Sequence, residues 1–254
     1  MTSPSPRGRY EPLVNLLVTE AGGYLNNTIL EPGITCRTCR TPITGGWLRC
    51  YPCNEQLRQF SSRLADYTAF LTYAIEGTQS AFTMYRYKDQ PPSETPHRIV
   101  TLLALTGLLL HTECLNRISG IPVTAWVVVP TLRGRASTHP LRNIVAPFAP
   151  GQEIPVTPTT TTGSRNTDAG LFRMPRLPSA SHVLVIDDTW ASGSHAQSLV
   201  LTARAAGAEL VSVLIVARWI KPTFADNKRF IAEHLNKLYD PRDCPWGSNA
   251  CQLV

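Results

Sequence analysis

The sequence predicts an α/β fold with a central, mostly parallel sheet flanked by helices. Residues 181–188 (SHVLVIDD) and 209–218 (ELVSVLIVAR) are short apolar runs rich in β-branched side chains, as in buried strands. The alanine-rich residues 195–208 between them (HAQSLVLTARAAGA) form a helical pattern that closes near Gly207. Strand, helix and strand in this order make a βαβ unit, whose two strands are parallel.

Four further segments are assigned by the same reasoning. Residues 124–130 (TAWVVVP) are β-rich and end on proline, which predicts another buried strand. Residues 64–75 and 97–118 carry apolar side chains at steps of three and four, which predicts two helices. Residues 149–170 have little apolar content and include a run of four threonines. We expect a long loop there, either a lid or a plain surface loop.

Composition narrows the class of protein. The 254 residues suit one or two domains, and 43% hydrophobic with 17% charged residues is typical of a soluble globular chain. The longest apolar run, residues 99–110, has 12 residues, whereas a membrane-spanning helix needs about 20. With no secretion signal at the start, we expect a cytoplasmic protein without a membrane span. A net charge of +6 suits a phosphate-bearing ligand or nucleic acid and does not choose between them.

Two CxxC pairs near the N-terminus predict a zinc site. Cys36 and Cys39 (CRTC) are followed, after ten intervening residues, by Cys50 and Cys53 (CYPC). A two-residue spacer lets both thiolates of a pair face one ion, and two such pairs favour structural zinc in a cytosolic chain. A thioredoxin-like redox pair and coincidental spacing are the alternatives.

The other three cysteines carry less information. Cys114 ends an apolar helical run and is expected to be a packing residue. Cys244 and Cys251 lie close together in the tail, where they could close a second metal site, form a disulfide or do neither.

These patterns divide the chain into four parts, which are an N-terminal tail and short helix (1–30), a zinc-ribbon-like module (31–58), the main α/β domain (59–222) and a C-terminal helix and tail (223–254). The zinc-ribbon-like module is too small for a core of its own, so bound metal would supply on the order of 10 kcal/mol of its folding free energy.

Two adjacent carboxylates, Asp187 and Asp188, stand at the end of the strand at 181–188, where parallel sheets bind their ligands. The small, hydroxyl-rich TWASGS follows and leads into the helix, whose first amides lack partners and carry the positive end of the helix dipole. A phosphate fits there, bound by the amides and by Ser192 and Ser194, while Gly193 allows close backbone approach. Two carboxylates would repel a nearby phosphate unless they bind something else, such as sugar hydroxyls or Mg²⁺. The stretch therefore predicts a ribose 5-phosphate site.

The segment VLVIDDTWASGSH, residues 183–195, resembles the 5-phosphoribosyl-1-pyrophosphate (PRPP) signature of type I phosphoribosyltransferases. The four-cysteine knuckle, YRYKD at 85–89, RGR after the proline-ended strand and SRNTDAGLF before the signature are similar to the competence-protein ComF family. The similarity covers residues 36–220. It implies a type I phosphoribosyltransferase-like fold, PRPP or a related ribose phosphate as ligand, Mg²⁺ as cofactor and phosphoribosyl transfer to an unidentified acceptor.

The resemblance also implies roles for individual residues. Asp187 and Asp188 would be the catalytic acids that hold the ribose hydroxyls, with Mg²⁺ nearby. Arg133 and Arg135 would bind the pyrophosphate leaving group and stabilise the charge that develops on it. The residues that would surround the 5′-phosphate are Thr189, Ala191, Ser192, Gly193, Ser194 and His195.

The chain departs from this family in ways that affect turnover more than binding. The phosphate loop usually reads Thr-Thr-Gly-x-Thr and here reads ASGSH, and Ala191 replaces the general-base aspartate of purine-salvage relatives. The alternative function is therefore a non-catalytic protein that senses PRPP or handles single-stranded DNA in competence-type uptake. Aromatic and basic residues are mixed in MYRYK and GGWLRCY, as in surfaces that stack bases. A structural zinc adaptor is a third alternative.

Overall fold

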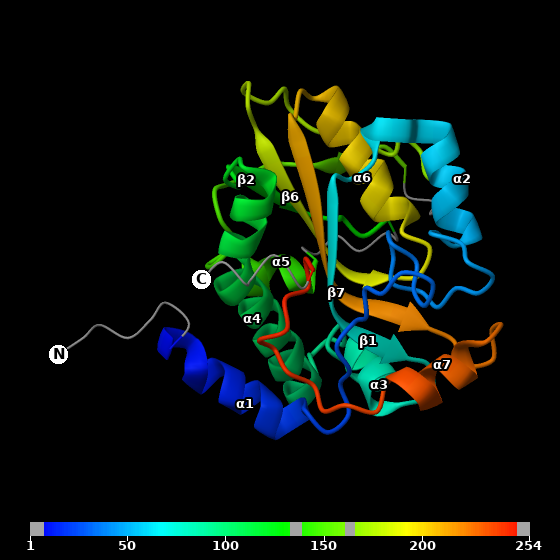
Figure 1. Cartoon of the computed structure of the whole chain (residues 1–254). Coiled ribbons are helices and arrows are strands. Elements are labelled where there is room, and N and C mark those ends of the chain that lie inside the picture. The colour runs from blue at the N-terminus through cyan, green and yellow to red at the C-terminus, as the bar shows by residue number, and fades with distance from the viewer. Residues whose placement is uncertain (1–7, 133–138, 161–165, 248–254) are drawn as a thin grey trace.

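The computed structural model describes residues 8–132, 139–160 and 166–247. Its centre is a five-stranded sheet in the order β1-β7-β6-β2-β3, in which every pairing is parallel. Figure 1 shows helices on both sides of this sheet, which confirms the predicted α/β class. The strands of the sheet are β1 (Tyr67–Ile75), β2 (Ala125–Val128), β3 (Gln152–Glu153), β6 (His182–Trp190) and β7 (Leu210–Ile220).

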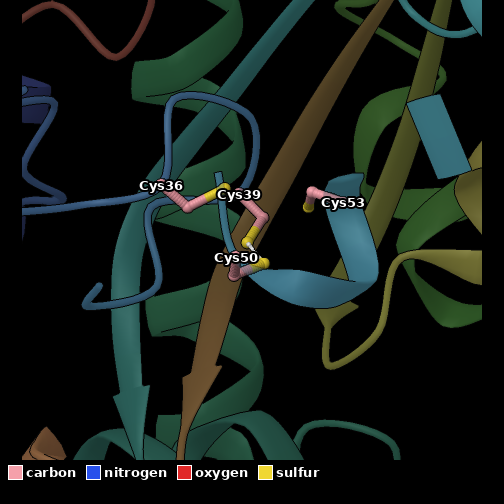
Figure 2. Close-up of side chains that lie close together, drawn as sticks. All are labelled: Cys36, Cys39, Cys50 and Cys53. Carbon is pink, nitrogen blue, oxygen red and sulfur yellow. Dashed lines mark hydrogen bonds between the residues drawn. The ribbon is translucent and has the colours of Figure 1, made fainter. Parts of the chain in front are cut away.

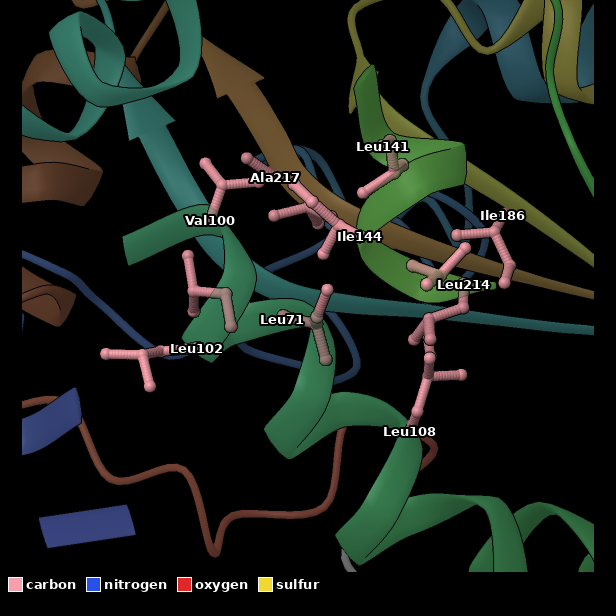
Figure 3. Packing of buried hydrophobic residues seen from close by; sticks show 14 of the residues in the cluster. Leu71, Val100, Leu102, Leu108, Leu141, Ile144, Ile186, Leu214 and Ala217 are labelled. Atoms are coloured by element: carbon pink, nitrogen blue, oxygen red, sulfur yellow. The ribbon is translucent and has the colours of Figure 1, made fainter. Parts of the chain in front are cut away.

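The helices form two layers around the sheet. One buried core joins the sheet to α1, α4 and α5. A second core, on the other face of the sheet, joins it to α6 and to Cys36, Cys39 and Cys53 of the zinc-ribbon-like module. Figure 3 shows part of the first core, where side chains of α4 and α5 meet Ile186 of β6 and Leu214 of β7. The helices are α1 (Glu11–Ala21), α2 (Tyr51–Phe60), α3 (Gln79–Arg86), α4 (Glu94–Ser119), α5 (Pro140–Val145), α6 (Ser194–Ala205) and α7 (Asn227–His234).

The strands predicted at 124–130, 181–188 and 209–218 are confirmed as β2, β6 and β7. Because side chains alternate along a strand, Val183 and Val185 of β6 join the core around α6, whereas Leu184 and Ile186 join the core around α4. Both faces of β6 are thus apolar and covered, which explains its central place in the sheet. The helix predicted between β6 and β7 is confirmed as α6.

The prediction of a helix over residues 64–75 is wrong. The segment forms β1, which pairs with β7 from Tyr67 opposite Ser212 to Ile75 opposite Ile220. The last seven residues of the strand are all buried. When both faces of a strand are covered, apolar residues occur at almost every position, so the steps of three and four that suggest a helix arise as well.

The helix predicted at 97–118 is confirmed and extends at both ends as α4. Among the described residues it is the one helix long and apolar enough to cross a membrane, and 61% of its apolar window is buried within the protein. Such burial is typical of the core helix of a globular fold. Gly107 permits the close approach of α4 to the sheet, because a Cβ there would lie 2.7 Å from both Cδ atoms of Leu71.

Residues 149–170 contain more regular structure than the predicted loop. β3 adds an edge strand to the sheet beside β2, and β4 (Thr157–Pro158) pairs antiparallel with β5 (Phe172–Arg173). The part beyond residue 165 is tied to two helices. The Asp168 amide donates to Ser198 Oγ of α6 at 2.8 Å, and Gln56 Nε2 of α2 donates to Thr167 Oγ1 at 2.9 Å.

Candidate functional site

The carboxyl ends of β2 and β6 lie side by side, and the chain leaves them toward opposite faces of the sheet. After β6 it enters α6, whose side chains belong to one core, whereas after β2 it leads to α5, whose side chains belong to the other. Open parallel sheets bind ligands in the crevice at such a reversal. Most of the residues predicted to bind a ligand lie at the end of β6 or just after it, and therefore at this point.

The two adjacent aspartates face opposite sides of the sheet, as the alternation along β6 requires. Asp187 is partly exposed and lines a cavity of about 800 Å³. Asp188 is 4% exposed and contacts residues at the end of α3 and the start of α5 instead. The structure thus gives different surroundings to two acids that the sequence presents as a pair.

Asp188 is the centre of a buried polar cluster. Its Oδ2 accepts a hydrogen bond from the Tyr87 hydroxyl at 2.5 Å and lies 2.5 Å from Lys88 Nζ and 3.3 Å from His139 Nε2. Burial alone would raise the pKa of Asp188, but Lys88 and His139 outweigh it and hold that pKa well below its usual range. Burial and the Asp188 charge raise the pKa of Tyr87, so the phenol keeps its proton and remains a donor. An ionised Asp188 therefore joins β6 to α3 and α5.

Asp187 has the opposite electrostatic balance. Burial, followed by the charge of Asp188, raises its pKa well above the ordinary value. Its Oδ1 accepts a hydrogen bond from the Asp188 amide at 2.9 Å. A cation or a pair of hydroxyl donors brought by a ligand would lower the pKa of Asp187 by stabilising its charged form. This cavity-facing carboxylate is therefore suited to Mg²⁺ or to a sugar diol.

The turn between β6 and α6 is shaped to receive an anion. Gly193 takes a left-handed conformation, with φ +75°, directly before the first residue of α6. A Cβ at this position would lie 2.0 Å from the ring of Trp190, which is buried and makes an edge contact with Phe70 at 5.5 Å. The Ser192 and Ser194 hydroxyls lie 3.0 Å apart at the same turn. Backbone amides, two hydroxyls and the positive end of α6 thus meet at one edge of the cavity.

The four N-terminal cysteines form one cluster. Figure 2 shows their side chains approaching one another from the knuckle loop and from the first turn of α2. The four sulfurs lie within 4.8 Å of one another, and Cys39 Sγ is 3.6 Å from Cys50 Sγ. Thiolates bound to one tetrahedral zinc ion at about 2.3 Å are about 3.8 Å apart. The donor set and its spacing therefore fit a zinc ion held by Cys36, Cys39, Cys50 and Cys53.

The cysteine knuckle docks firmly on the sheet through polar contacts. The Tyr73 hydroxyl of β1 donates to the Arg40 carbonyl at 2.9 Å, and Thr68 Oγ1 donates to the Thr38 carbonyl at 2.7 Å. Arg218 of β7, only 7% exposed, donates from Nε to the Cys39 carbonyl at 2.8 Å. The knuckle is thereby fixed beside the carboxyl ends of β7 and β6.

Arg218 also reaches the turn between β6 and α6. Its Nη1 donates to the Trp190 carbonyl at 2.8 Å and to the Ala191 carbonyl at 3.2 Å. One buried guanidinium therefore connects the knuckle to the turn after β6. The knuckle and the turn after β6 both border the 800 Å³ cavity, and its remaining walls come from the end of β7 and from α7.

The structure gathers most of the predicted ligand-binding residues around this cavity. Arg133 and Arg135 lie outside the described residues, and Asp188 is not part of the lining. The predicted residues that line the cavity are Asp187, Thr189, Ala191, Ser192, Gly193, Ser194 and His195.

Several site residues were not predicted. Tyr87 and Lys88 occur in YRYKD and MYRYK, which the sequence marks only for a family resemblance and for possible base stacking, but Tyr87 is fully buried. Their contact with Asp188 spans about 100 residues of chain. His139 and Arg218 have no local pattern that marks them. Lys221 and Phe224 line the cavity because the chain turns after β7, which no periodicity indicates.

Comparisons with known proteins add little to this geometry. No family model and no curated protein sequence matches the chain. A hypoxanthine phosphoribosyltransferase from Staphylococcus aureus is similar over 49% of this chain and 74% of its own, with 11% identity and a TM-score of 0.31. A hypothetical protein from Neisseria gonorrhoeae, solved with bound ppGpp, is similar over 52% and 87%, with 15% identity and a TM-score of 0.26. At such identities the roles of single residues have to be argued from the site itself.

The two aspartates should respond to neutralisation with opposite changes in stability. Asp187→Asn removes a carboxylate whose folded-state pKa is raised, so the wild type loses stability relative to this variant as pH rises through that pKa. At pH 7.5 we expect a Tm increase of about 2–4 °C, the effect of roughly 1 kcal/mol in a chain of this size. Asp188→Asn removes the charged acceptor of the buried Tyr87 hydroxyl and the partner of Lys88 and His139, and should cost about 2 kcal/mol at the same pH.

Thermal unfolding of both variants between pH 5 and pH 8 measures these effects. The stabilisation by Asp187→Asn should grow with pH. If both substitutions lower the Tm equally, the division of roles between the two carboxylates is wrong.

Gly193→Ala should be far more damaging than the same substitution at a glycine with similar backbone conformation. Gly77 has φ +83°, and a Cβ added there would meet no neighbouring atom within 4 Å, whereas at Gly193 the new Cβ would overlap Trp190. Gly77→Ala should cost about 1–2 kcal/mol for left-handed strain alone. Gly193→Ala should cost at least about 2 kcal/mol more, because a packed core resists overpacking. Urea unfolding of the pair tests this, and equal losses would show that the Trp190 contact is unimportant.

Proposed function

We propose that this chain is a ComF-type, phosphoribosyltransferase-like protein that binds PRPP with Mg²⁺ in the cavity beside β6. The observation that carries the proposal is that Asp187 and the N-terminal turn of α6 border the same cavity. Asp187 is suited to a diol or a cation, and the turn at the start of α6 is suited to a phosphate. A ribose 5-phosphate presents both groups on one small molecule.

In this proposal the 5′-phosphate binds the amides at the start of α6, with the Ser192 and Ser194 hydroxyls as further donors. The ribose hydroxyls and Mg²⁺ bind at Asp187. Asp188 is a positioning residue, since its carboxylate already accepts from Tyr87 and pairs with Lys88 and His139. Arg133 and Arg135 are proposed to bind the pyrophosphate.

The cavity extends beyond the ribose-phosphate edge toward the knuckle and α7. Tyr51 and Phe224 line this part and are 78% and 69% exposed, so flat apolar surface is available to a second ligand. We place the acceptor there. Transfer would break the bond between the ribose C1 and pyrophosphate, and a bond from the acceptor nucleophile to C1 would form. Pyrophosphate would leave with the electron pair.

Isothermal titration with PRPP and Mg²⁺ tests the binding step. The zinc-loaded protein should bind one PRPP per chain, and Asp187→Asn should weaken binding at least tenfold, about 1.4 kcal/mol. Glu233→Gln is the matched control, because Glu233 is a carboxylate that lines the same cavity on α7, away from β6. It should bind PRPP as the wild type does. Absence of binding by folded, zinc-loaded wild type would refute the proposed ligand.

Binding of single-stranded DNA is the second candidate function. It is favoured by Trp47 and Tyr51 on the knuckle, whose side chains are 68% and 78% exposed and available to stack on bases. Affinity for an oligothymidine should then fall steeply with salt concentration and should drop for Trp47→Ala. Tight DNA binding together with no PRPP binding would make this the primary function.

A further inference from the structure

A second cluster of metal-ligating side chains lies on the other face of the sheet from the cysteine knuckle. His111 and Cys114 come from adjacent turns of α4, and Cys244 comes from the segment that follows α7. A ligand atom from each residue lies within 4.8 Å of the other two. His111 and Cys114 are 2% and 3% exposed, and Cys244 is half-buried at the edge of the same core.

The histidine is oriented as a metal ligand. Its Nε2 lies 2.8 Å from the Pro241 carbonyl oxygen, which can only accept a hydrogen bond, so Nε2 carries the proton. Nδ1 is then the unprotonated ring nitrogen, and it faces Cys114 Sγ at 4.0 Å. Ligating histidines are held in this way, with the second ring nitrogen donating to a backbone carbonyl. Pro241 and Cys244 belong to the same short segment, which would thus supply both a ligand and the group that orients the histidine.

Spacing and charge both fit a thiophilic divalent ion. In a tetrahedral zinc site, an imidazole nitrogen and a thiolate sulfur are about 3.6 Å apart, close to the observed 4.0 Å. Two thiolates and one neutral imidazole balance the charge of Zn²⁺. A neutral complex of this kind avoids the cost of burying net charge beside the apolar core.

We propose that His111 Nδ1, Cys114 Sγ and Cys244 Sγ form a second zinc site, independent of the knuckle. It would fix the C-terminal segment to α4. That segment has no helix or strand over residues 235–247. The segment also makes two hydrogen bonds with Asn27: Asn27 Nδ2 donates to the Asp240 carbonyl at 2.7 Å, and the Asp240 amide donates to Asn27 Oδ1 at 2.8 Å.

The site would explain why an irregular segment packs into the core. Tyr239 and Trp246, on either side of the cluster, are 3% and 8% exposed and belong to the core around α4. A metal between them would hold both aromatic side chains in place. Loss of the ion should therefore expose this segment before the rest of the protein unfolds.

Zinc stoichiometry of the full-length chain tests the proposal. Protein purified under reducing conditions with zinc should contain two ions per chain, measured by elemental analysis and by colorimetric release. Cys244→Ser and Cys114→Ser should each contain one, and Cys53→Ser, which damages only the knuckle, should also contain one. Far-UV circular dichroism checks the fold of every variant.

Two further measurements keep the test decisive if a variant folds poorly. Co²⁺ added to Cys53→Ser should give the absorption of a tetrahedral site with thiolate-to-metal charge transfer, and Cys244→Ser in that background should abolish it. Limited proteolysis should cut residues 235–247 at least tenfold faster in Cys244→Ser than in the zinc-loaded wild type, whereas Cys53→Ser should be cut there as slowly as the wild type. One zinc per chain in the wild type, unchanged by Cys244→Ser, would overturn the proposal. So would a Cys114–Cys244 disulfide, detected as two missing thiols in the denatured protein.

Discussion

The buried guanidinium of Arg218 is the contact on which the candidate site depends most. It donates to the carbonyl of Cys39 in the knuckle and to the carbonyls of Trp190 and Ala191 in the turn after β6. These segments are separated by about 150 residues of sequence, and the side chain that joins them comes from β7. Hydrogen bonds from Nε and Nη1 to carbonyl oxygens of separate segments use the fixed geometry of a guanidinium, which a lysine ammonium cannot reproduce. The cavity exists because both structures are held at one place.

A second polar centre has the same effect on the opposite face of the sheet. Asp188 joins the end of β6 to the ends of α3 and α5 through Tyr87, Lys88 and His139. Because these contacts satisfy its charge, the neighbouring Asp187 is left as the carboxylate that faces the cavity. Protein groups stabilise Asp188 on one face of the sheet, and Asp187 on the other face remains available to a ligand. This arrangement accounts for two adjacent acids in an otherwise apolar strand.

The fold and the centre of the site were predictable because their signals are local. The βαβ unit of β6, α6 and β7 follows directly from apolar runs around an alanine-rich helix, and the spacing of the cysteines indicates a shared metal site. β1 was missed because a strand with both faces buried lacks the alternation that distinguishes it from a helix. The opposite surroundings of Asp187 and Asp188, and the role of Arg218, depend on contacts between distant segments, which no window of sequence contains.

The most direct test of this account is the affinity of Arg218→Lys for PRPP with Mg²⁺, measured by titration beside Arg229→Lys. Arg229 also lines the cavity but its side chain is 65% exposed on α7, so the same substitution there should leave affinity unchanged. Arg218→Lys keeps the charge and should keep bound zinc, yet binding should weaken at least tenfold, about 1.4 kcal/mol, because the turn is no longer fixed to the knuckle. Unchanged affinity in a folded, zinc-loaded Arg218→Lys would show that the knuckle and the turn act independently, and would contradict the account.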